Sequence, residues 1–135
     1  MAKLVRTLVL IAVLCLIALG ALLWRANRPF TSEVPVLSSS RLTAGNALFP
    51  SQLALYPRRV VHYKPRIVGH VEEAIAVEQI ALVRVKEGVF FSDLFIETSG
   101  GAHSIICRGL EKKKANRIRL QIHEAIEASR TVDSP

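Results

Sequence analysis

The sequence predicts an N-terminal transmembrane α-helix followed by a small α+β domain, in which an antiparallel β-sheet is closed by one C-terminal amphipathic helix. Three observations support this fold class. Residues 7–24 form an uncharged apolar run, apolar and polar residues alternate through much of 58–110, and apolar residues recur at helical spacing over 111–130. A period of two residues is typical of strands and one of 3.6 is typical of helices, so we expect the strands to precede the helix.

The first expected element is a membrane span. As a helix, Thr7–Trp24 would be about 27 Å long, close to the thickness of the hydrocarbon core of a bilayer. Trp24, Arg25 and Arg28 stand at its end, where an aromatic ring and long cationic side chains are expected to meet lipid headgroups. We therefore predict that these three residues lie at the membrane interface.

A cleaved signal peptide is the competing interpretation of the same run, because it also begins with a short basic segment and an apolar one. The best cleavage position, Ala18-Leu19-Gly20, has no polar segment before it, and apolar residues continue through Trp24. Leu14 stands before Cys15 where a lipoprotein signal needs a small residue. We therefore favour an uncleaved anchor.

The charges leave the side of the membrane open. Lys3 and Arg6 precede the span and Arg25 and Arg28 follow it, so the positive-inside rule is nearly balanced. The short tail of residues 1–6 favours a domain outside the cytoplasm, whereas an unpaired thiol in the domain favours a reducing compartment. We expect a cytoplasmic domain and keep the opposite topology as the alternative.

Residues 25–55 are expected to form a tether between the span and the domain. Pro, Ser, Thr and Gly are frequent in 29–50, and no helical or strand period lasts there, apart from one short strand near Val34–Leu37. Such a tether would hold the domain away from the bilayer or lie along a partner.

The domain is predicted over residues 56–130 and begins with strands at 58–64, which Pro65 ends, and at 66–77. Further strands are expected at 81–88, 94–99 and 103–110. Glu73 interrupts the apolar face of the second strand, which indicates a bulge or frayed stretch. Gly100-Gly101 is a hairpin signal. The inward-facing residues of these strands are predicted to be Ile67, Val71, Ile75, Val77, Ala81, Val83, Val85, Leu94, Ile96 and Thr98.

The last element of the domain is predicted to be an amphipathic helix over 111–130, followed by a polar tail at 131–135. Its apolar face would cover the exposed apolar side of the sheet. The residues of that face are Ala115, Ile118, Ile122, Ala125, Ile126 and Ser129.

The order of apolar positions and glycines resembles that of a known family. The residues that carry the resemblance are Ile75, Val77, Gln79, Ile80, Val83 and Gly88, then Phe90–Ile96, Ser99–Gly101 and Ile105–Gly109. Strands ending in one helix resemble a pleckstrin-homology-like (PH-like) barrel, and this pattern is closer to the bacterial PH-domain membrane proteins. The resemblance implies a PH-like sheet or partial barrel, no catalytic motif, and the bacterial inner membrane. It leaves open whether the barrel is incomplete or takes its first strands from the tether.

The titratable residues do not form a recognisable reactive site. None of the histidines takes part in a His and Cys ligand motif of the kind that binds zinc, and the histidines are His62, His70, His103 and His123. Cys107 is expected to be a small core residue. Asp93 is expected in a turn, where its carboxylate would accept backbone N–H groups. We therefore predict no catalytic residue, no cofactor and no metal.

Two groups of basic residues are candidates for contacts with anionic lipid headgroups or an acidic partner, in a chain of formal net charge +7. One group is expected on the first strand pair and the turn between its strands, where eukaryotic PH domains bind phosphoinositides. The other is in the first helical turn, where positive charge opposes the helix dipole. Solvated surface charge is the alternative for both. The residues are Arg58, Arg59, Lys64, Arg66, Lys112, Lys113 and Lys114.

Three phenylalanines are candidates for contacts with another protein. Phe95 is expected to point outward, because Leu94 and Ile96 take the inward positions, and Phe90-Phe91 lie at a loop tip. An exposed aromatic patch suits a docking site for another subunit, although these rings could also fold back onto the core.

The predicted function is that of a single-pass membrane protein without catalytic activity, acting as an accessory, scaffold or assembly subunit of a larger membrane complex. The alternative is a module that senses anionic lipid headgroups through its basic residues. Few aromatic side chains are available for stacking on bases, and the span restricts access, so we expect no nucleic-acid partner.

Overall fold

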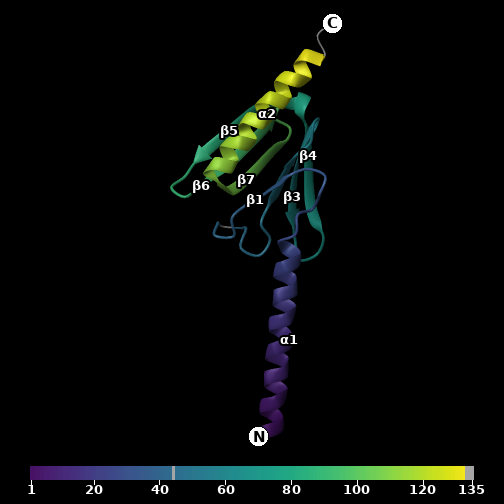
Figure 1. The fold of residues 1–135 in the computed structure, drawn as a ribbon, viewed down its shortest axis with the longest axis vertical. Helices are drawn as coiled ribbons and strands as arrows, with labels where there is room; N and C mark the ends of the chain where they lie inside the picture. The colour runs from purple at the N-terminus through teal and green to yellow at the C-terminus, as the bar shows by residue number, and fades with distance from the viewer. Residues whose placement is uncertain (44, 133–135) are drawn as a thin grey trace.

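The structure is a computed structural model that describes residues 1–43 and 45–132 (Figure 1). An apolar helix comes first, strands follow, and a helix closes the chain, so the predicted coarse fold class is confirmed. The elements are α1 (Ala2–Ala26), β1 (Val36–Ser38), β2 (Gln52–Leu55), β3 (Arg59–Pro65), β4 (His70–Ala76), the 3₁₀ turn η1 (Val77–Gln79), β5 (Ile80–Glu87), β6 (Phe91–Thr98), β7 (Ser104–Glu111) and α2 (Lys112–Val132).

The strands form two antiparallel sheets. Sheet A has the order β1-β2-β3-β4 and sheet B the order β5-β6-β7. Figure 1 shows α2 packed across the domain, while α1 projects away from it as a separate rod. The helix and the two sheets therefore surround one core, from which α1 is excluded.

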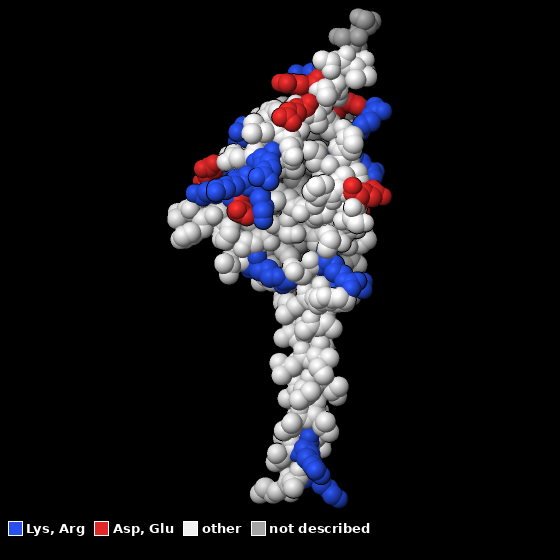
Figure 2. Space-filling model, in the orientation of Figure 1, with Lys and Arg blue, Asp and Glu red and all other residues white. Residues whose placement is uncertain are grey.

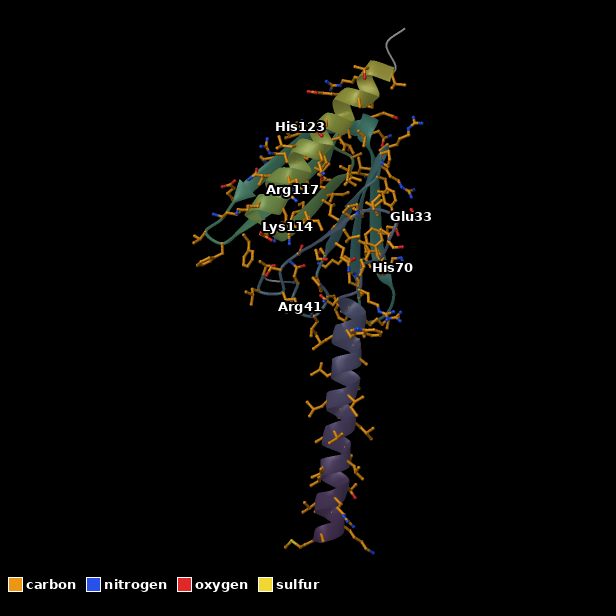
Figure 3. The ribbon with its side chains drawn as sticks, in the orientation of Figure 1. Glu33, Arg41, His70, Lys114, Arg117 and His123 are labelled. Atoms are coloured by element: carbon orange, nitrogen blue, oxygen red, sulfur yellow. The ribbon has the colours of Figure 1, made fainter. Side chains whose placement is uncertain are left out.

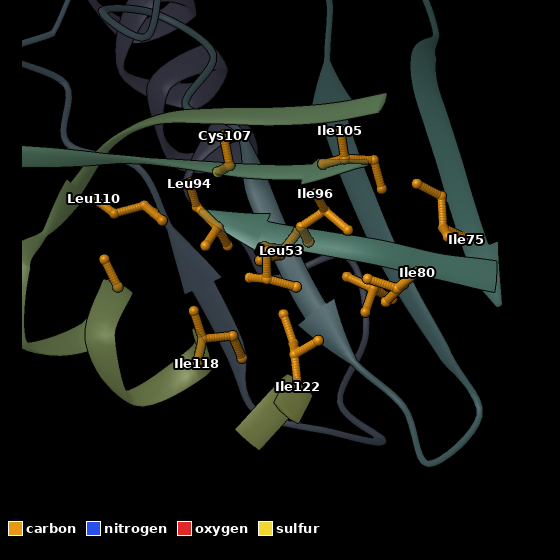
Figure 4. Close-up of a cluster of buried hydrophobic side chains, with 13 residues drawn as sticks. Leu53, Ile75, Ile80, Leu94, Ile96, Ile105, Cys107, Leu110, Ile118 and Ile122 are labelled. Carbon is orange, nitrogen blue, oxygen red and sulfur yellow. The ribbon is translucent and has the colours of Figure 1, made fainter. Parts of the chain in front are cut away.

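The core lies between the two sheets and α2 (Figure 4). Leu94 and Ile96 of β6 are fully buried, and Ile122 of α2 packs into the same cluster. The predicted inward face of β6 is confirmed at Leu94 and Ile96, and the predicted helical face at Ala115, Ile118 and Ile122. Cys107 is also fully buried, as expected of a small core residue.

Two predicted details of the strands are wrong. Residues 66–69 form a turn rather than the start of a strand, because Gly69 adopts a positive φ of 76° and reverses the chain. Ile67 is consequently exposed rather than inward-facing. β4 pairs regularly with β3 at Glu73, whereas a register shift lies between Ile80 and Leu82, so Ile80 takes the inward position and Ala81 is exposed.

The expected tether contributes to the folded domain. Residues 25–55 contain β1, near the one strand expected there, and also β2, whose Leu53 is fully buried in the core. Ala54 and Val61 point to the opposite face of sheet A, yet both are at most 1% exposed. The chain after α1 passes this face, where Phe30 stacks on Tyr63 with ring centroids 4.8 Å apart. The sequence predicted that the domain starts at Tyr56, but the folded domain begins well before that residue.

The C-terminal helix extends slightly beyond its predicted end. It continues to Val132, so it includes the first residues of the expected polar tail. Residues 133–135 of that tail lie outside the described part of the chain.

Candidate membrane-facing site

The helix α1 is long and apolar enough to cross a membrane, with a mean hydropathy of 2.8. Most of its side chains are exposed, and only its last turn is packed against the domain, where Ala26 is buried. The residues around this last turn therefore define the end of the domain nearest to any bilayer that α1 enters.

Gln52 joins the end of α1 to sheet A. Its side-chain amide donates from Nε2 to the carbonyl oxygen of Arg28 at 2.7 Å, and its Oε1 accepts the N–H of Phe30 at 2.9 Å. The residue is only 1% exposed. A buried amide whose two polar atoms both have partners favours one conformation of the chain, because losing either bond would leave a polar group without a partner.

Arg41 makes a second connection to α1 (Figure 3). Its guanidinium donates to the carbonyl oxygens of Ala47 at 3.0 Å and Leu48 at 3.3 Å, within its own loop, and to that of Leu23 at 3.3 Å. The carbonyl oxygen of Leu23 also accepts the N–H of Asn27 at 3.1 Å, and the C-terminal end of a helix attracts positive charge. Arg41 therefore fixes the β1–β2 loop against the C-terminal end of α1.

The β1–β2 loop is also held to β7. The side-chain Nδ2 of Asn46 donates to Thr43 Oγ1 at 2.8 Å and to the carbonyl oxygen of Arg108 at 3.1 Å. Its Oδ1 accepts the N–H and the hydroxyl of Ser51. Asn46 is 3% exposed, so its bonds are protected from water. These bonds join Thr43 and Asn46 of the loop to Ser51 and β7.

Gly109 is a point of close approach between β7 and this loop. It has a positive φ of 75°, and a Cβ here would overlap the side chain of Thr43. Its carbonyl oxygen accepts the N–H of Ser40 at 2.7 Å, and its N–H donates to Asp93 Oδ1 at 3.0 Å. The turn position predicted for Asp93 is wrong, because the residue lies within β6, although its carboxylate does accept a backbone N–H.

Five basic residues lie around the end of α1, and we call them the basic collar. Figure 2 shows Lys and Arg side chains on both sides of the junction between α1 and the domain. Two hollows open at this junction, and neither has an acidic residue in its lining. None of the five takes part in an ion pair within 1–43 and 45–132. The basic collar consists of Arg25, Arg28, Arg41, Lys64 and Arg66.

Exposed apolar side chains accompany the basic collar. Ile67 and Val68, in the β3–β4 turn, are 76% and 89% exposed. Leu42 and Leu48 of the β1–β2 loop are exposed as well. We call these four residues the apolar tips. Ile67 and Leu22 of α1 line the same hollow, so the β3–β4 turn lies near the end of the apolar helix. Cations that suit phosphate groups and apolar tips that suit acyl chains thus occupy one end of the domain.

The predicted interface residues Trp24, Arg25 and Arg28 all lie at this end. The Arg28 guanidinium sits 3.6 Å from the centre of the Trp24 ring, a cation–π contact. The structure brings Lys64 and Arg66 to the same place. Arg41, Gln52 and the apolar tips were missed by sequence reasoning. For the apolar tips, the sequence offered one signal, which is the apolar pair Ile67-Val68 just before Gly69 and between two strands.

The basic cluster expected on the first strand pair is split in the structure. Arg58 and Arg59 stand at the start of β3, whereas Lys64 and Arg66 stand at its end, about 20 Å away for a strand of this length. Arg58 is paired with Glu78 at 3.0 Å. Arg58 and Arg59 therefore belong to the opposite end of the domain from the basic collar.

The remaining candidate residues lie away from α1. Lys112, Lys113 and Lys114 occupy the first turn of α2, where Lys114 pairs with Glu111 at 3.0 Å. Phe90 is 80% exposed at the β5–β6 turn. Phe91 and Phe95 are half-buried, and the Arg84 guanidinium lies 5.1 Å from the Phe95 ring centre. The three phenylalanines thus do not form one exposed patch.

Two titratable residues of the domain, Cys107 and His62, are buried. Burial raises the pKa of the Cys107 thiol to about 11, even though the hydroxyl of Ser39 lies 3.5 Å from its sulfur. His62 is buried with Nδ1 at 3.2 Å from Glu73 Oε2. Within the described ranges, no group of three or more His, Cys, Asp and Glu side chains could hold a metal ion.

In comparisons with known proteins, the chain matches no protein-family model and no curated protein. The resemblance to the bacterial PH-domain proteins therefore stays a prediction, and the candidate site has to be interpreted from its own geometry.

Proposed function

We propose that this chain is a single-pass membrane protein whose domain rests on the bilayer surface and acts, without catalysis, as an accessory or scaffold subunit of a membrane complex. The observation that carries this proposal is the fixed connection between α1 and the domain through Gln52 and Arg41. A subunit that positions partners relative to a membrane requires a fixed geometry between its anchor and its binding surfaces.

The membrane-facing site supports the same arrangement. The apolar tips can enter the boundary between headgroups and acyl chains, while the cations of the basic collar face phosphates. With the site against the bilayer, α2 extends away from the membrane (Figure 1). Its exposed surface and that of sheet B are then available to other subunits.

Purification of the full chain from its native membranes, with a tag after Pro135, tests the scaffold role. Mass spectrometry is expected to detect at least one co-purifying subunit in stoichiometric amount. A Gln52→Ala variant should lose part of that subunit and be cleaved faster by protease within residues 29–35, because its anchor is loosened. Gln79→Ala, at an exposed glutamine of η1 away from α1, is the matched control. A clean monomer from the unaltered chain would contradict the proposal.

We also propose a PH-like barrel and a cytoplasmic domain on the bacterial inner membrane. Seven strands in two sheets followed by one helix, counted over 1–43 and 45–132, support the fold, since the segment before Tyr56 supplies the strands that were in question. Topology can be measured on a Ser38→Cys, Cys15→Ser chain, because Ser38 is exposed. An impermeant maleimide should label it only after the cells are broken. Labelling of intact cells would reverse the topology.

Recognition of anionic lipid is the second candidate function. It is favoured by the basic collar, since four of its five cations line two hollows that have no acidic residue in their linings, and Arg41 contacts the end of α1. Anionic headgroups would fit this position, and their binding should weaken with salt because the cations are partly exposed.

The lipid proposal can be tested with full-length protein in neutral detergent, by titrating phosphatidylglycerol or phosphatidylcholine in mixed micelles. The protein is expected to prefer phosphatidylglycerol. A Lys64→Gln, Arg66→Gln variant should lose most of this preference, whereas the matched pair Arg58→Gln, Arg59→Gln at the opposite end should keep it. Equal losses in the two variants would show that net charge, and not the basic collar, attracts the lipid.

A further inference from the structure

A groove lies between β1 and α2, separate from the membrane-facing site. Its volume is about 390 Å³, and no residue of the basic collar or the apolar tips lines it. Its apolar floor is formed by Val36 and Leu37 of β1, Leu55 of β2 and Ile118 of α2. The groove is therefore bounded by a strand on one side and a helix on the other.

The strand side of the groove is a free sheet edge. Ser39 donates its N–H to Ser51 at 2.8 Å, whereas Ser40 donates in the opposite direction, to Gly109 of β7, at 2.7 Å. Backbone groups of alternate residues in an extended chain point to the same edge. Val36 and Ser38 therefore present theirs on the side of Ser40, away from β2. In the described part of the chain β1 pairs only with β2, and the groove runs along this edge.

The helix side of the groove is basic. Lys114 and Arg117 of α2 line it, Gln121 completes that wall, and no acidic residue is among its lining residues. Figure 3 shows Lys114 and Arg117 on the same part of α2, and Figure 2 shows Lys and Arg gathered there. Arg117 has no ion-pair partner among the residues that the structure describes. The N-terminal end of α2 adds its own positive potential to this wall.

We propose that this groove binds an extended segment of a partner protein, in which apolar and acidic residues alternate, as an added strand on β1. Strand addition satisfies the free backbone groups of Val36 and Ser38. Alternation places the apolar side chains of the segment on the groove floor and its carboxylates toward Lys114 and Arg117. This inference rests on the proposed scaffold function and names the surface and the class of partner it would use.

The test uses the full-length protein in neutral detergent and fluorescent peptides of about eight residues, enough to extend past the short edge of β1. One peptide alternates Val and Glu, a second replaces Glu by Lys, and a third is the Val/Glu peptide with N-methyl groups on alternate backbone nitrogens. Fluorescence anisotropy is expected to show binding of the first peptide alone. Equal binding of the Lys peptide or of the N-methylated peptide would overturn the proposal, and so would no binding of the Val/Glu peptide.

Protein variants locate the binding site. Arg117→Glu should weaken binding of the Val/Glu peptide by about tenfold or more, because it places a carboxylate beside those of the peptide. The matched variant Arg58→Glu, at a paired and exposed arginine away from the groove, should leave binding within about twofold. Equal effects of the two variants would overturn the assignment. Thermal unfolding of each variant shows that both remain folded.

Co-purification separates this inference from the scaffold proposal. If Arg117→Glu loses the stoichiometric subunit that the unaltered chain retains, both proposals are supported. If the subunit is retained in full, the groove is not its binding site, although the scaffold role stands. If no subunit accompanies the unaltered chain but the Val/Glu peptide binds as expected, the scaffold proposal fails and the groove assignment stands.

Discussion

The two ends of the domain use basic residues differently. At the end opposite α1, Arg58 is paired with Glu78 at 3.0 Å, and Arg59 lies over the Tyr56 ring at 4.9 Å. At the membrane-facing end, the residues of the basic collar have no acidic partner in the described ranges, and exposed Ile67 and Val68 stand beside them. Basic residues of one sequence cluster thus serve internal contacts at one end and remain available to an external anionic surface at the other.

This difference shows that a local charge count does not identify a binding surface. Arg58 and Lys64 are close in sequence and were predicted to act together, but β3 carries them to opposite ends of the domain. Position relative to α1, and the absence of a nearby carboxylate within the described residues, distinguish the cations that are available for binding.

The largest expected effect tests whether the segment between the span and β3 belongs to the core. Leu53→Ala should lower the free energy of unfolding by about 2–5 kcal/mol, because Leu53 is fully buried against the sheets. Leu42→Ala should change it by less than about 0.5 kcal/mol, since Leu42 is 87% exposed at the membrane-facing end. Thermal unfolding in detergent measures both. Similar losses would mean that the apolar tips are part of the fold rather than free for lipid.

Gly109 tests how firmly the membrane-facing loop is held to β7. Gly109→Ala should cost about 1–2 kcal/mol for its positive φ, and more because the new Cβ would meet Thr43. Gly101→Ala is the matched control, because Gly101 has a φ of 66° and open space around it. Unfolding measurements should show the greater loss at Gly109. An equal loss would indicate that the loop can move away at little cost.

The titration of Cys107 tests whether water reaches the interior next to the β1–β2 loop. Its pKa is raised from 9.0 to about 11 by burial, so the unfolded chain loses the thiol proton first as the pH rises. Stability from this group is complete below pH 9.0 and decreases as the pH rises toward 11, by about 2–3 kcal/mol in total. Alkaline unfolding of Cys107→Ser against the unaltered chain checks this. A thiol that reacts readily with maleimide at pH 8 in the folded protein would contradict the buried position.

The smallest expected effects on stability are those of replacing Arg58, which is paired with Glu78, and Arg66 of the basic collar. Arg58→Gln removes an exposed ion pair and should cost at most about 1 kcal/mol, an effect that salt should reduce. Arg66→Gln should cost less, because Arg66 has no ion-pair partner in the described part of the chain. Urea unfolding of both variants at low and high salt would measure these two losses of stability. A larger, salt-sensitive loss for Arg66 would reveal an internal role and weaken its assignment to the basic collar.

Part of the candidate site could be predicted from the sequence. Trp24, Arg25 and Arg28 were recognisable because a residue just after an apolar span lies at the interface whatever the rest of the chain does. Arg41 and Gln52 were not, since their roles depend on Leu23 and Arg28, which are distant in sequence. Ile67 was assigned to a strand because its apolar side chain fitted the alternation, although Gly69 turns the chain there.

By itself, the sequence determined α1, the strands β5–β7 and α2, together with the buried positions Leu94 and Ile96 of β6 and Ala115, Ile118 and Ile122 of α2. These elements are long enough for the spacing of their apolar residues to identify them, and this spacing can be determined from neighbouring residues alone. Tertiary structure alone decided that β2 exists, that β1 pairs with it and that the chain after α1 covers sheet A. Strands of three and four residues are too short to show a period, and they form because Leu53 finds a core assembled from distant elements. The membrane-facing site depends on the same contacts, which join α1, the β1–β2 loop and the β3–β4 turn.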